Sequence, residues 1–141
     1  MVNWMWSIGV AILILGTGFS SVFALGSLDR VIISDERLVN AFGEKLSGSI
    51  NINQQVQIAT DITNGQTEDQ PFVYILQIKN SDGHIISVST IAGELQQAQS
   101  FSAALSWNPD QSGIYVAEIY VWESLVNADA LAKSKTLQII V

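Results

Sequence analysis

The chain has 141 residues, of which 48% are apolar and only 13% are charged, and its net charge is −7. This length suits one domain with a core of its own, and the apolar content excludes a disordered tail. The negative charge disfavours nucleic-acid binding, because a phosphate backbone repels it. The chain has no cysteine, which excludes disulfides, thiolate metal sites and thiol nucleophiles.

Residues 1–26 are predicted to form a hydrophobic helix that meets a membrane. No charged residue precedes Asp29. The apolar run over residues 4–25 is about 33 Å long as a helix, which is enough to cross a hydrocarbon core of about 30 Å. Gly16 and Ser20 in this run form a small-x-x-x-small pair, a pattern that supports helix packing but is common by chance.

Two interpretations of this segment remain open. Val22 and Ala24 form the small-residue pattern of a signal peptide that is cleaved after Ala24. The alternative is a retained single-pass anchor, because no Lys or Arg precedes the run and because Trp4 and Trp6 suit an interfacial aromatic belt. In both cases the chain from Asp29 onward is expected outside the cell membrane, either anchored to it or secreted to the cell surface.

Residues 27–35 are expected to be a linker, and residues 36–141 to form one all-β domain. Apolar and polar residues alternate with the period of two that is typical of strands, and the phase slips near Asn53, which indicates a bend or bulge. The expected strands lie at residues 50–62, 72–78, 84–91, 101–107, 114–122 and 135–141. About seven short strands separated by turn residues predict an immunoglobulin-like β-sandwich.

The aromatic residues around position 110 are predicted to be mainly structural. Tyr115 follows a turn and begins a central strand, which is the context of a tyrosine corner. Trp107 ends the strand before it, and both residues are expected in the core. Tyr120 and Trp122 share the phase of Glu118, a residue type that is rarely buried unpaired, so their face of the strand is expected to be partly exposed.

The connection before the last strand is the candidate partner contact, through Trp122, Leu125, Val126 and Leu131. It is too long for a tight hairpin, and binding residues often lie on such end loops. The alternative is that Leu125 and Leu131 fold back and close the core.

No residue pattern predicts catalysis, a cofactor or a metal site. His84 is the one histidine, and it is expected to be a solvated turn residue, so a zinc site or a serine-hydrolase triad would lack its partners. Asp61, Glu68 and Asp69 flank one loop; we expect a polar surface loop there, with a calcium site as the alternative.

Four blocks of this sequence carry a resemblance to a known family: DITNGQTEDQPFVYILQIKNSDG, GELQQAQSFSAALSW, PDQSGIYVAEIYVWES and NADALAKS. Together they resemble the Ig-like, CARDB-type modules in exported proteins of ammonia-oxidising archaea (Thaumarchaeota), over roughly residues 36–141. The sequence departs from that family at Asn53, Ala98 and Ala128, where Gly, Gly and Pro are usual, and all three are expected in turns. The resemblance implies an extracytoplasmic adhesion or scaffolding module without catalytic residues.

Two functional hypotheses follow. The first is a non-catalytic module at the archaeal cell surface, acting in protein–protein interaction or envelope structure. The second is an accessory single-pass subunit of an integral membrane enzyme complex, such as ammonia monooxygenase, with the sandwich on the outer face. The expected partners are the membrane, if the helix is not cleaved, and other envelope or membrane-complex proteins.

Overall fold

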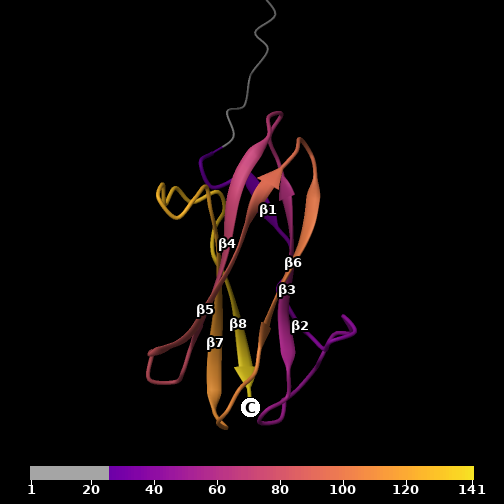
Figure 1. The fold of residues 1–141 in the computed structure, drawn as a ribbon, viewed down its shortest axis with the longest axis vertical. Coiled ribbons are helices and arrows are strands. Elements are labelled where there is room, and N and C mark those ends of the chain that lie inside the picture. Colours follow the sequence, from indigo (N-terminus) through magenta and orange to yellow (C-terminus); the bar gives the residue numbers. More distant parts are fainter. Residues whose placement is uncertain (1–25) are drawn as a thin grey trace, which may run out of the picture.

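A computed structural model describes residues 26–141 as two antiparallel β-sheets packed face to face (Figure 1). The eight strands of this part are β1 (Val31–Ile33), β2 (Arg37–Val39), β3 (Val56–Asn64), β4 (Gln70–Lys79), β5 (Ile85–Leu95), β6 (Ser100–Trp107), β7 (Ile114–Trp122) and β8 (Lys135–Ile140). The predicted immunoglobulin-like β-sandwich is confirmed.

The predicted N-terminal helix and the residues assigned to it lie outside the described residues. These residues are Trp4, Trp6, Gly16, Ser20, Val22 and Ala24. Within residues 26–141, no helix has the length and apolar content needed to cross a membrane.

One sheet has the order β5-β4-β7-β8. In the other sheet β3 is central: β6 pairs along one side of it, while β1 and β2 pair one after the other along the opposite side. The two sheets therefore leave two open sides on the sandwich. One lies between β5 and β6, and the other lies between β1 and β8 (Figure 1).

The core lies between the two sheets and is built by strand alternation. On β4, for example, Phe72, Tyr74, Leu76 and Ile78 all point inward and are buried. Trp107 and Tyr115 belong to this core, with ring centroids 5.0 Å apart in an edge-to-face arrangement. The Tyr115 hydroxyl donates a hydrogen bond of 2.9 Å to the carbonyl oxygen of Gln111, which is the geometry of a tyrosine corner.

The structure corrects two predictions. Residues 27–35 are not a linker, because Val31–Ile33 forms β1, pairs with β3 and buries Val31 in the core. Residues 50–62 are not one strand, because β3 begins only at Val56. The phase slip marks a turn at residues 51–54, in which the Gln54 N–H donates to the Asn51 carbonyl and Asn53 has a positive φ of 62°.

Candidate binding surfaces

The loop between β7 and β8 separates the residues that were predicted to contact a partner. Ser124 and Asn127 close a tight turn with two hydrogen bonds. The Ser124 N–H donates to the Asn127 carbonyl, and the Asn127 N–H donates to the Ser124 hydroxyl oxygen. This turn leaves Leu125 64% exposed and Val126 100% exposed. We call the surface formed by Leu125 and Val126 the end tip.

Leu131, in the same loop, is fully buried in the core, so its predicted role in partner contact is wrong. The physical reason is backbone pairing: the Leu131 N–H donates to the Val121 carbonyl, and the Leu131 carbonyl accepts from Val31. These two bonds fix Leu131 between the sheets. The alternative, in which Leu125 and Leu131 both close the core, is correct for Leu131 and wrong for Leu125.

Arg30 attaches this loop to the segment that precedes β1. Its guanidinium donates to the Asp129 carboxylate at 2.6 Å and lies 3.6 Å from the Glu123 carboxylate, while its Nε donates to the Ser27 carbonyl. Asp129 and Glu123 lie at either end of the turn, so one cation clamps the base of the loop. The end tip is therefore held at the end of the sandwich where the chain emerges from residue 26 (Figure 1).

A second surface is the outer face of the sheet β5-β4-β7-β8. The Glu118 carboxylate accepts hydrogen bonds from Gln77, Lys79 and the Tyr120 hydroxyl at distances of 2.7 to 3.0 Å. Lys79, with smaller contributions from Tyr120 and Gln77, holds the pKa of this carboxyl below its usual range against the opposing effect of partial burial. Glu118 on this face is thus fully paired, which explains how a charged residue fits in a central strand.

Tyr120 and Trp122 extend this outer face toward the end tip. Their ring centroids are 6.0 Å apart and the rings are tilted by 56°. Both side chains are half-buried, as the phase of β7 predicted. On the neighbouring strand β4, Ile75 lies opposite Tyr120 and Val73 lies opposite Trp122. Ile75 and Val73 are buried although they point away from the main core. Trp122 therefore shields an apolar patch on the outer sheet face and is only partly available to a partner.

The acidic residues that were considered as calcium ligands do not form a common site. Asp61 lies on β3, where Arg37 binds both of its carboxylate oxygens at 3.0 and 3.1 Å and Ser102 donates at 2.6 Å. These donors, Arg37 first, hold the pKa of the Asp61 carboxyl below its usual range. Asp61 thus joins β2, β3 and β6 into one sheet. Glu68 and Asp69 lie in the next loop, and nowhere in residues 26–141 do three His, Asp or Glu side chains gather.

His84 is exposed in the turn between β4 and β5. Its backbone N–H donates to the side-chain oxygen of Asn80, which also accepts from Asp82. This geometry gives His84 the place expected for a turn residue.

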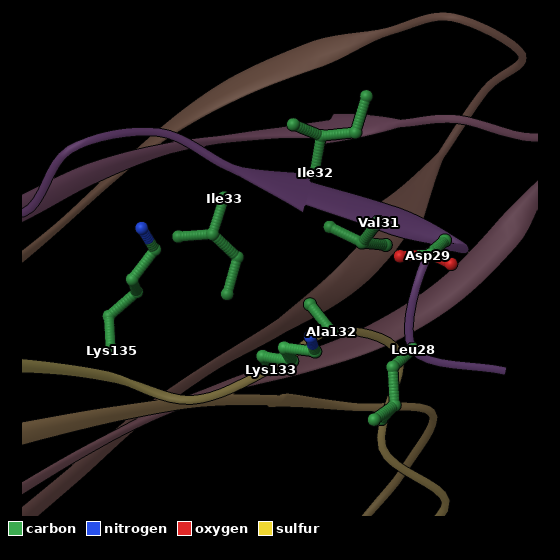
Figure 2. Close-up of a pocket in the computed structure, with 8 residues that line it drawn as sticks. All are labelled: Leu28, Asp29, Val31, Ile32, Ile33, Ala132, Lys133 and Lys135. Atoms are coloured by element: carbon green, nitrogen blue, oxygen red, sulfur yellow. The ribbon is translucent and has the colours of Figure 1, made fainter. Parts of the chain in front are cut away.

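The third surface is a groove between β1 and β8, which the sequence did not predict (Figure 2). Its volume is about 220 Å³, and it is lined by Leu28, Asp29, Val31, Ile32, Ile33, Ala132, Lys133 and Lys135. We call it the edge groove. Lys133 and Lys135 are close together in the sequence, but the apolar residues beside them come from β1, about 100 residues earlier in the chain. No local sequence pattern therefore predicts that the lysines and this apolar wall form one groove.

No protein-family model matches the chain, and no curated protein matches its sequence. The fold is similar to that of the C-terminal domain of wzt, with a TM-score of 0.68 and 16% identity over 82% of this chain and 75% of that one. It is also similar to the CARDB domain of the PF1109 protein from Pyrococcus furiosus, solved with di-metal ions, with a TM-score of 0.56 and 12% identity over 84% and 97%.

Part of a β-glucuronidase from Bacteroides uniformis is similar too, with a TM-score of 0.57 and 10% identity. That match covers 74% of this chain but only 13% of the enzyme chain. Identities this low show a shared fold and nothing about activity, because Ig-like sandwiches host many unrelated functions.

Proposed function

We propose that this chain is a non-catalytic, extracytoplasmic Ig-like module of the archaeal cell surface that acts in protein–protein interaction or envelope structure. The observation that carries this proposal is the end tip, where Leu125 and Val126 are exposed side by side on a clamped loop. The archaeal setting and the location outside the membrane rest on the sequence resemblance and on the apolar segment over residues 4–25.

The end tip suits contact with a protein for two physical reasons. Its apolar side chains gain free energy when a partner removes them from water. Its backbone is already fixed by the Ser124–Asn127 turn and by Arg30, so that docking orders little additional chain.

The second candidate is an accessory single-pass subunit of an integral membrane enzyme complex, with ammonia monooxygenase as the example that the resemblance suggests. The position of the end tip favours it. The loop that bears Leu125 and Val126 is tied to Arg30, which follows the apolar segment by only a few residues. If that segment spans a membrane, the end tip lies close to the membrane surface, where it can contact the outer loops of a membrane partner.

Copurification from native membranes tests the proposal. The double variant Leu125→Ser/Val126→Ser should keep the melting temperature of the parent and lose the copurified protein. The matched control is Phe42→Ser, which also removes a side chain that is 90% exposed, but in the turn after β2. If the double variant retains the copurified protein, or if Phe42→Ser loses it equally, the end tip is not the contact.

Intact-mass measurement on the native protein separates the two candidates. A retained N-terminus within a copurified membrane complex supports the accessory subunit. Cleavage after Ala24 removes the membrane basis of that role and leaves the free module.

A further inference from the structure

The edge groove has an apolar wall, and three charged residues line it: Lys133, Lys135 and, at one end, Asp29. Val31, Ile33 and Ala132 provide apolar side chains, and Lys133 and Lys135 project beside them (Figure 2). A backbone bridge between Asp29 and Ala132 closes one end of the groove. Ile33 and Lys135 line the opposite end (Figure 2).

Lys135 is the one residue of β8 that lines the groove, and beyond it the outer edge of β8 has no strand partner in the described chain. The reciprocal hydrogen bonds between Gly113 and Val141 set the phase of the pairing between β7 and β8. In an antiparallel ladder the bonded residues alternate, so the N–H and C=O groups of Thr136, Gln138 and Ile140 point away from β7. The carbonyl of Ile140 does so, since it accepts a bond from Ile50. Within the described chain, Thr136 and Gln138 have no strand beside them on that side.

The charge of the groove is unusual for this chain. The chain has six cationic residues against thirteen acidic ones. Arg30, Arg37 and Lys79 all form salt bridges with carboxylates. Within residues 26–141, Lys133 and Lys135 form none, and both line the groove.

We propose that the edge groove binds an extended acidic peptide segment of a partner protein. The segment adds as a strand to the free edge of β8 at Thr136 and Gln138, and it places its carboxylates against Lys133 and Lys135. Backbone pairing supplies affinity and the alternate side chains supply specificity, as in other strand-addition complexes. This inference deepens the proposed function, on which it rests, by giving the partner a chemistry.

A second copy of the chain is a poor occupant for this groove. Asp61, Glu118 and Asp129 are already paired with cations. Of the free sheet edges in the described chain, β5 carries one carboxylate, Glu94, and β6 carries none. Pairing β5 of one copy with β8 of the next is also head-to-tail, which produces open filaments unless the rotation closes.

The test uses fluorescence anisotropy with the full chain in detergent and a labelled peptide of alternating valine and glutamate. The parent should bind this peptide, and should bind its glutamine analogue about tenfold more weakly because the same ion pairs are absent. Lys133→Gln/Lys135→Gln should weaken binding about tenfold, because two exposed ion pairs are lost. Lys45→Gln is the matched control: Lys45 forms no salt bridge within the described residues and lies outside the groove, so it should bind as the parent does.

Gln138→Pro separates strand addition from simple ion pairing. The N–H of Gln138 points away from β7, so proline removes no bond between β7 and β8 but blocks an added strand. Provided that its melting temperature is unchanged, this variant should lose peptide binding while both lysines remain. If it binds as the parent does, strand addition is wrong.

Three other outcomes overturn the proposal. These are a parent that does not bind the acidic peptide, a double-lysine variant that binds it normally, and self-association of the chain that the double-lysine variant abolishes. The last outcome would assign the groove to a second copy. The end-tip variant Leu125→Ser/Val126→Ser leaves the groove intact. Copurification of that variant tests the proposed function, whereas peptide binding by the lysine and proline variants tests this inference, so the two can fail separately.

Discussion

Replacing Ala98 with glycine should stabilise the domain. Ala98 has a positive φ of 57° and occupies the third position of a turn in which the Gln99 N–H donates to the Gln96 carbonyl. Only the third residue of this turn has a positive φ, which is the signature of a type II turn and favours glycine. A non-glycine residue in this conformation costs about 1–2 kcal/mol of folding free energy. Glycine removes this strain, but it also increases the conformational entropy of the unfolded chain, which offsets part of the gain.

We therefore expect Ala98→Gly to raise the free energy of unfolding by about 1 kcal/mol, and the melting temperature by about 4 °C for a domain of this size. Differential scanning calorimetry on the full chain measures both. Asn53 occupies the same position of a similar turn with a φ of 62°. Asparagine tolerates the left-handed region better than alanine does, so Asn53→Gly should gain only a few tenths of a kcal/mol.

Two substitutions serve as controls for Ala98→Gly. Ala128 is also an exposed alanine, but it has no positive φ, so Ala128→Gly should be neutral or destabilising by about 0.5 kcal/mol. Gly83 has a φ of 81°, and the space that a Cβ atom would occupy there is open, so Gly83→Ala should destabilise through the backbone alone. Equal melting temperatures for Ala98→Gly and Ala128→Gly would refute the reasoning.

Three further predictions concern other parts of the sandwich. Tyr115→Phe should destabilise by about 1 kcal/mol in calorimetry, because the bond to Gln111 is lost while the exposed turn lets water reach that carbonyl. Leu131→Ala should cost about 2–5 kcal/mol by leaving a cavity, whereas Leu125→Ala should change stability by less than about 0.5 kcal/mol. The pKa of Glu118 is lowered by folding, so its stabilisation is present above the unfolded pKa and is lost as the pH falls through the folded pKa; Glu118→Gln should flatten the dependence of melting temperature on pH below about 5.

The central strands β4 and β7 and the edge strand β6 were predictable from their own residues. β7 is apolar on both faces, β4 carries large apolar residues at every second position, and β6 alternates up to Trp107. β1 and β2 have three residues each, which is too short to display a period of two. They form because β3 offers a free edge, and no local sequence window contains that edge.

The same limit explains the outcome for the candidate contact residues. Leu125 and Leu131 are the same residue type in the same loop, yet one is exposed and the other is buried. The difference comes from the bonds of Leu131 to Val121 and Val31, and pairing with β1 is invisible from the loop alone. For that reason the sequence predicted that this loop would expose apolar side chains, but not which of its side chains would be exposed.

The end tip and the edge groove are connected through one short stretch of chain. From Asp129, which Arg30 clamps, to Lys133 the chain passes through Leu131 in the core and the bridge at Ala132. A peptide that follows these four steps in extended form needs only about 13 Å. If one partner contacts the end tip and also lays a strand along β8, each contact raises the effective concentration of the other. For such a partner, loss of the end tip and loss of the groove lysines must each weaken the whole complex, rather than only half of it.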